Sequence, residues 1–234
     1  VINLIPILFI PLKVLYGLTY SQLGFLVLIN FVTQISVDVI FSGLADKYGF
    51  RGLSILGLIF ACLGLCMFAL TPFLFSNIYL GFVISTMVFS GGGGLLEMIL
   101  SPIVDTIPTD VKATAMSVLH AAFAWGSVCI IIVTTLFIYI FGSSSWQIIL
   151  ALWIIVPIID IILFSIVPMC KPIPAHELMN LTDLLKHPVF IVTLIAIMVG
   201  GASEVTMSQW ASAFLERGLN LPKFFVNLLV AEVF

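Results

Sequence analysis

One acidic residue, Glu97, stands inside a long apolar run, three residues after four consecutive glycines (91–94). A carboxylate in apolar surroundings is costly unless it is paired or neutralised. Glycines let neighbouring helices approach closely, which would bring a second helix near this carboxylate. We therefore expect Glu97 to bind and release a proton. The alternative is a structural glutamate that stays hydrogen-bonded.

A second polar cluster lies far along the chain, where Glu204, Ser208, Gln209 and Trp210 interrupt an apolar run. Residues four apart share one side of a helix. Hydroxyl and amide groups beside an aromatic ring suit a sugar, whose hydroxyls form hydrogen bonds and whose ring face can stack on tryptophan. We assign Glu204, Gln209 and Trp210 to substrate binding. Polar contact between helices is the alternative.

Asn30, Gln34 and Asp38 are spaced four residues apart and form one polar stripe along a helix. Such a stripe would be costly against lipid, so it must face protein or water. We expect Asn30 and Gln34 to line a substrate cavity, and Asp38 to serve a gate. His120 and Trp125, in another apolar run, are assigned to the same cavity, where a histidine can also relay a proton. A structural hydrogen bond is the alternative for His120.

Long apolar runs carry all these residues. Only 8% of the residues are charged, against about a quarter in soluble domains, so lipid is the natural solvent. A spanning helix needs about 20 mostly apolar residues, and the runs do not alternate as barrel strands do. The predicted spans are residues 1–18, 20–45, 52–71, 78–107, 113–141, 146–169 and 188–215, with another from 223. We predict an all-α integral membrane protein, with six complete and two partial transmembrane helices.

The basic residues predict an orientation. Lysine and arginine are concentrated in cytoplasmic connections. One side of the predicted membrane carries Lys47, Arg51, Lys112, Lys171 and Lys186, and the other carries Lys13, Arg217 and Lys223. The connections after the second, fourth and sixth spans are therefore expected to be cytoplasmic.

A short pattern occurs twice, 201 residues apart, at residues 17–19 and 218–220. Each copy has Gly-Leu followed by Thr or Asn, which suits a sharp hairpin because glycine ends helices and Thr or Asn begins them. Six spans separate the copies, as in transporters with parallel six-helix halves; chance is the alternative. We expect a fragment of a twelve-helix protein. Residues 1–169 would form the first bundle, 170–187 a cytoplasmic linker, and 188–234 the start of the second bundle.

The segment at residues 42–51, Ser-Gly-Leu-Ala-Asp-Lys-Tyr-Gly-Phe-Arg, resembles the signature loop of the major facilitator superfamily, G-x-L-A-D-[RK]-x-G-[RK]-[RK]. Serine replaces the first glycine and phenylalanine replaces one basic residue. The matching residues, which the resemblance assigns to a gating loop, are Asp46, Lys47, Gly49 and Arg51. Gly49 permits a tight turn, and Asp46 could cap a helix end and pair with a basic residue. An ordinary charged loop is the alternative.

Residues 91–105 and 120–126 are also similar to the fucose–proton symporter-like transporters within that superfamily. In that group a carboxylate of the fourth helix takes part in proton coupling, and Glu97 occupies the matching place. The resemblance implies alternating access between two bundles. It also implies proton-coupled (or sodium-coupled) uptake of a sugar or similar small polar solute, by a monomer in the plasma membrane.

Other classes of function find less support. An exporter of the same fold is the first alternative, although the fifth span lacks a Gly-Pro-x-x-Gly-Gly pattern. An intramembrane enzyme would require a catalytic signature such as His-Glu-x-x-His, which is missing. There is no basic run for nucleic acid, and the four cysteines lack metal-ligand or disulfide spacing. We expect no metal and no cofactor.

Overall fold

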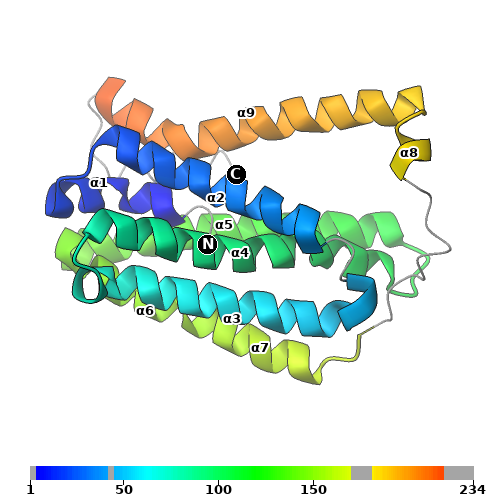
Figure 1. The fold of residues 1–234 in the computed structure, drawn as a ribbon, viewed down its shortest axis with the longest axis horizontal. Helices are drawn as coiled ribbons and strands as arrows, with labels where there is room; N and C mark the ends of the chain where they lie inside the picture. The colour runs from blue at the N-terminus through cyan, green and yellow to red at the C-terminus, as the bar shows by residue number, and fades with distance from the viewer. Residues whose placement is uncertain (1–3, 42–44, 170–180, 219–234) are drawn as a thin grey trace.

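The protein is a set of long helices that run side by side (Figure 1). The computed structural model describes residues 4–41, 45–169 and 181–218, with the backbone alone at some of these positions, including 45–48, 204–205 and 208–209. No strand occurs among the described residues, so the all-α prediction is confirmed. The α-helices are α1 (Leu4–Tyr16), α2 (Tyr20–Phe41), α3 (Ala45–Leu74), α4 (Ile78–Asp105), α5 (Lys112–Phe141), α6 (Trp146–Trp153), α7 (Ile155–Ile166), α8 (Leu181–Leu184) and α9 (Pro188–Gly218).

Five helical segments within the described residues are long and apolar enough to cross a membrane: Tyr20–Phe41, Gly49–Leu74, Ile78–Asp105, Lys112–Phe141 and Ser143–Ile166. They correspond to the second to sixth predicted spans. The sixth contains a short 3-10 turn (Ser143–Ser145) and a break at Ile154 between α6 and α7. Pro157 explains the break, because it has no N–H to donate to the carbonyl of Trp153 one turn earlier. The helix of the seventh predicted span, α9, is continuous over 31 residues.

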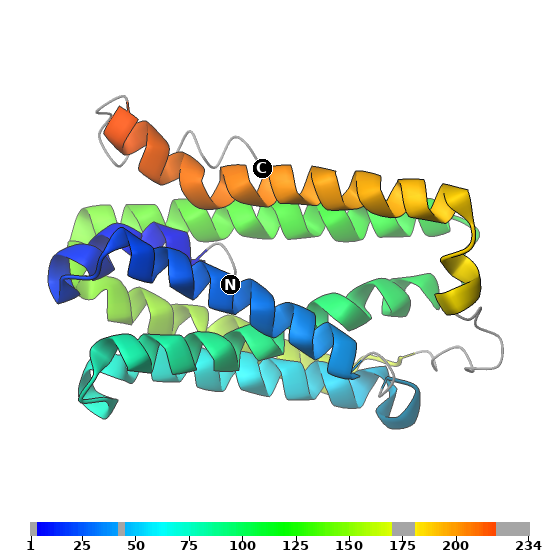
Figure 2. The ribbon, with the colours of Figure 1, turned by 45° about the horizontal axis from the view of Figure 1, so that its top comes forward.

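The connections alternate between the two ends of the helices (Figures 1 and 2). The α1–α2, α3–α4 and α5–α6 connections lie at one end, and the α2–α3 and α4–α5 connections lie at the other, together with α8. Arg51, Lys112 and Lys186 belong to the second end, and Lys13 belongs to the first. The described basic residues are therefore distributed between the ends as their positions in the sequence predict.

The hairpin between α1 and α2 has the predicted chemistry. Gly17 ends α1 with a φ of 67°, a left-handed conformation that glycine adopts at little cost. Thr19 and Gln22 then form a reciprocal cap, in which the Gln22 N–H donates to Thr19 Oγ1 (3.2 Å) and the Thr19 N–H donates to Gln22 Oε1 (2.8 Å). The second copy of the pattern, at residues 218–220, extends outside the described residues.

Glycines allow α3 and α4 to pack almost backbone to backbone. A Cβ atom on Gly92 would lie 2.6 Å from Ala61 N and would also overlap the carbonyl oxygen of Gly57. A Cβ atom on Gly64 would lie 2.6 Å from Phe89 Cα. Cβ atoms are essentially never found this close to backbone atoms, so side chains at Gly64 and Gly92 would force the helices apart. The α3–α4 pair is consequently the closest-packed part of the scaffold that carries Glu97.

An aromatic cluster stabilises the end of the bundle where α1 meets α2. The rings of Phe68 and Phe82 lie 4.7 Å apart, and both pack against Trp146, which is 1% exposed. Tyr16 packs edge-on against Trp146, with ring centroids 6.0 Å apart. These residues come from α1, α3, α4 and α6, so the cluster holds four helices in register.

Candidate functional site

The polar stripe of α2 lies against α4. Asn30 is 3% exposed and accepts a hydrogen bond at its Oδ1 from Ser90 Oγ of α4, at 2.6 Å. Gln34 is 5% exposed, and its Nε2 lies 3.5 Å from the place where Gly93 would carry a Cβ atom. The stripe therefore faces protein, as expected for polar groups inside a membrane span. In this structure Asn30 and Gln34 are buried between two helices, and their exposure to a substrate cavity stays a prediction.

The tetraglycine brings α4 to α2 as well as to α3. A Cβ atom on Gly94 would lie 3.1 Å from Gln34 Cα and 3.4 Å from Val37 Cβ. Gly92 faces α3 instead, so successive glycines serve two neighbouring helices. The absence of side chains here is what allows the polar stripe of α2 to reach α4.

Glu97 and Asp38 lie toward the same end of this α2–α4 interface, the end that carries the α2–α3 and α4–α5 connections. Glu97 lies one turn beyond Gly93 on α4, and Asp38 lies one turn beyond Gln34 on α2. Their positions on the two facing helices place the Asp38 carboxyl group close enough to that of Glu97 for electrostatic repulsion between them. Glu97 is exposed at the edge of the interface, although we expected it to be buried. The structure thus brings together a predicted coupling residue and a predicted gating residue.

His120 and Trp125 lie on α5, apart from the α2–α4 interface. Both side chains are exposed, and Trp125 is 71% exposed. Their assignment to substrate binding stays a prediction.

The predicted residues of α9 divide into two groups. The side chains of Glu204 and Gln209 fall outside the described part of the structure. Trp210 packs edge-on against Phe9 of α1, with ring centroids 6.2 Å apart, and its Cη2 lies 3.4 Å from the Cβ position of Gly24 on α2. In this conformation Trp210 contacts the first helices of the chain, close to the α1–α2 hairpin.

A family model of the major facilitator superfamily matches residues 2–233. The chain belongs to this superfamily. The superfamily consists of membrane transporters. This assignment therefore excludes the alternative of an intramembrane enzyme.

Two solved structures share the fold of this superfamily member. One is described as the inward open conformation of the xylose transporter XylE from E. coli, with a TM-score of 0.64, 14% identity, and coverage of 99% of this chain and 62% of that chain. The other is the crystal structure of a D-xylose-proton symporter, with a TM-score of 0.69, 15% identity, and coverage of 99% of this chain and 64% of that chain. The chain thus spans less than two thirds of either structure. None of the curated proteins matches the sequence.

The structure describes only part of the signature loop. Gly49 has a φ of 71° and separates one helical turn from the long part of α3, as the predicted tight turn requires. Arg51 donates a hydrogen bond from Nη2 to the carbonyl oxygen of Val167, at 2.7 Å. That carbonyl lies at the C-terminal end of α7, where a cation is favourable to the helix dipole. The side chains of Asp46 and Lys47 fall outside the described part, so the predicted latch stays a prediction.

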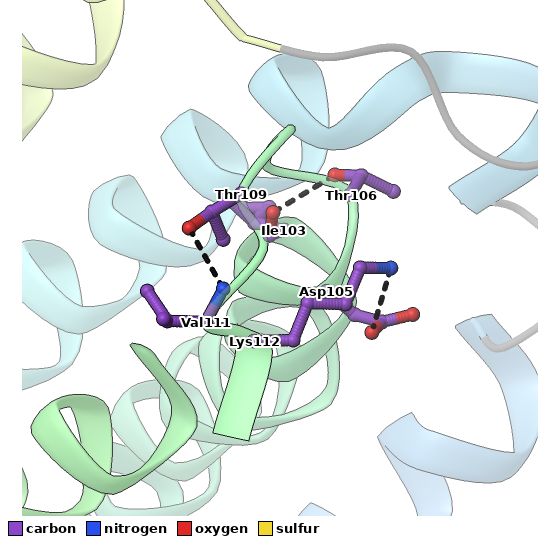
Figure 3. Close-up of polar contacts among 6 residues, drawn as sticks. All are labelled: Ile103, Asp105, Thr106, Thr109, Val111 and Lys112. Atoms are coloured by element: carbon purple, nitrogen blue, oxygen red, sulfur yellow. Dashed lines mark hydrogen bonds and ion pairs between the residues drawn. The ribbon is translucent and has the colours of Figure 1, made fainter. Parts of the chain in front are cut away.

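The connection after α4 carries another ion pair (Figure 3). Lys112 Nζ lies 3.4 Å from Asp105 Oδ1, and Thr106 Oγ1 donates to the carbonyl oxygen of Ile103 at 2.8 Å. The Lys112 and Asp105 side chains are 55% and 54% exposed, so solvent screens the pair and it contributes little stability. Asp105 is thereby engaged with Lys112 at the surface.

Ser90 is a residue of this interface that our reasoning from sequence missed. It lies seven residues before Glu97, on the same face of α4, and this spacing was the available signal. A serine in an apolar run is common, however, and its partner Asn30 is 60 residues away in the sequence.

Replacing Ser90 with alanine should destabilise the protein by about 1–2 kcal/mol, because Asn30 Oδ1 would remain buried without a donor. Thermal unfolding of the full-length protein in detergent measures this change. Ser165→Ala is the matched control, since Ser165 is exposed and donates to the carbonyl oxygen of Ile161 in its own helix. The control should change stability by no more than about 0.5 kcal/mol. Equal effects of the two variants would contradict the importance of the Asn30–Ser90 bond.

Proposed function

We propose that the full-length protein is a secondary transporter that takes up a sugar or similar small polar solute together with a proton. The observation that carries this proposal is the carboxyl group of Glu97 beside Asp38, within a membrane-spanning helix of a major facilitator fold. An intramembrane carboxyl group that can exchange a proton can couple proton movement to solute movement. The two similar structures, described as a xylose transporter and a D-xylose-proton symporter, support a sugar as the solute.

The mechanism proposed is alternating access. Residues 1–169 would form one bundle and residues 170–187 the cytoplasmic linker, and the bundle that begins at residue 188 would rock against the first. Glu97, which is exposed in the described chain, would then face the space between the bundles. Asn30, Gln34, His120, Trp125, Glu204, Gln209 and Trp210 remain the proposed solute-binding residues. The loop from Asp46 to Arg51 would control the cytoplasmic side of a monomer in the plasma membrane.

Uptake by the full-length protein in liposomes tests the proposal. A panel of labelled sugars that begins with D-xylose is supplied with an inward proton gradient, with an inward sodium gradient, and with neither. Accumulation of one sugar that needs the proton gradient is the expected result. Accumulation driven only by the sodium gradient would identify sodium, and not the proton, as the coupling ion. Failure of every sugar to accumulate in liposomes that hold correctly folded protein would reject sugar uptake and favour another solute or export.

A further inference from the structure

Two buried polar atoms of α2 find no hydrogen-bond partner among the described residues. They are Gln34 Nε2 and Asp38 Oδ1, which stand one helical turn apart on the side of α2 that faces α4. Gln34 is only 5% exposed, so bulk water does not solvate its amide. Buried polar groups in native proteins are almost always hydrogen-bonded. Two such atoms in succession therefore mark a place that is built for a further polar group.

The α4 side of this place carries a carboxyl group. Gln34 Nε2 lies beside Gly93, and Glu97 follows one turn beyond Gly93 on the same face. The negative charge of Asp38 reaches the Glu97 carboxyl group from the neighbouring helix. Two carboxylates so placed cannot both ionise without a repulsive cost, and a single proton held between them removes that cost.

The other described titratable groups on the helices around this place have partners or surroundings of their own. Among the described residues, Asp38 is the charged group whose influence on Glu97 the structure records, and the side chains of Asp46 and Lys47 at the start of α3 fall outside the description. The described groups on α3, α4 and α5 have other surroundings: Arg51 bonds to Val167, Asp105 pairs with Lys112, Cys62 interacts with Cys66, and His120 is exposed. None of these described groups places a cation beside the pair.

We propose that Asp38 is the second carboxyl group of the coupling site and shares one proton with Glu97, with the Gln34 amide as a hydrogen-bond donor to the pair. This inference rests on the proposed coupling role of Glu97. On loading, a proton from the outer solution forms an O–H bond with a carboxylate oxygen of Glu97, and that O–H donates toward Asp38. The pair then carries one negative charge instead of two. On release, the same O–H bond breaks and the proton passes to cytoplasmic water. Asp38 would thus take part in proton coupling as well as in the gate to which the sequence analysis assigned it.

Infrared titration of the purified full-length protein tests this proposal without any substrate. The carbonyl band of protonated carboxyl groups is followed as the pH is raised, for the wild type, Asp38→Asn, Glu97→Gln and Asp160→Asn. Asp160 lies in α7 and serves as the matched control, because it is a half-buried carboxyl group of another membrane span. Labelling of the aspartates with carbon-13 separates the Asp38 band from the Glu97 band.

Asp38→Asn should move the midpoint at which Glu97 loses its proton downward by about one pH unit or more, because a repelling negative charge has been removed. Asp160→Asn should leave that midpoint in place. A Glu97 midpoint that is the same in Asp38→Asn and in the wild type would overturn the proposal.

Two further variants keep the test decisive if Asp38→Asn does not fold. Asp38→Ser removes the same charge with a smaller neutral side chain and should lower the Glu97 midpoint as Asp38→Asn does, because Glu97 loses its proton while Asp38 is already ionised. Asp38→Glu preserves the charge and should keep the Glu97 midpoint near that of the wild type. Equal Glu97 midpoints in Asp38→Ser and Asp38→Glu would overturn the proposal. The uptake assay tests the proposed function independently of this titration. The proposed function fails if Glu97→Gln retains proton-driven uptake.

Discussion

Glu97→Gln is expected to abolish proton-driven accumulation of the solute while leaving its downhill exchange across the membrane intact. Glutamine keeps the size and hydrogen-bonding capacity of the side chain but can neither bind nor release the coupling proton. An inward gradient of about one pH unit is worth about 1.4 kcal/mol, which supports about tenfold accumulation per proton. The variant should reduce this ratio to about one. Uptake into liposomes with and without the gradient measures the loss.

Two controls make the result specific to Glu97. Asp160→Asn removes another intramembrane carboxyl group and should retain gradient-driven accumulation. Counterflow of labelled solute against unlabelled solute reports binding and exchange without net proton movement, and it should persist in Glu97→Gln. Full gradient-driven accumulation by Glu97→Gln would refute its coupling role. Loss of counterflow together with accumulation would show instead that Glu97 serves binding or folding.

Gly92→Ala is expected to destabilise the protein by about 2–3 kcal/mol or to prevent its folding. The added Cβ atom would meet Ala61 N at 2.6 Å and overlap the Gly57 carbonyl oxygen, and both of these atoms belong to the α3 backbone. A backbone cannot rotate away as a side chain can, so the helices must separate and lose their close packing. Thermal unfolding and monodispersity of the full-length protein in detergent measure the effect.

Gly91→Ala provides a control from the same run of four glycines. A Cβ atom there would lie 3.9 Å from Val37 Cγ2, which is an ordinary van der Waals contact. Alanine also favours a helix over glycine by about 1 kcal/mol, so this variant should be neutral or slightly more stable. Adjacent glycines are thus expected to respond in opposite directions. Equal tolerance of alanine at both positions would contradict the α3–α4 packing described above.

Local chemistry determined much of this protein from the sequence alone. The length and continuity of the apolar runs predicted all-α membrane spans, because a lipid environment leaves few ways to satisfy backbone hydrogen bonds. The α1–α2 hairpin followed from Gly17 and Thr19, and the kink near the start of α3 followed from Gly49. These features depend on residues within a few positions of one another. The superfamily was likewise recognisable from one short loop, and the match over residues 2–233 confirms it.

Only the tertiary structure decided which polar residues meet. The spacing of Asn30, Gln34 and Asp38 predicted a shared face but not its partner, which is the face of α4 that carries Ser90 and Glu97. Trp210 likewise packs on Phe9 and Gly24, far away in the sequence. Such contacts depend on how each helix is rotated and how deeply it sits beside its neighbour. Apolar runs do not encode that rotation locally, because lipid and protein interiors are similarly apolar, and close packing of small residues selects it instead.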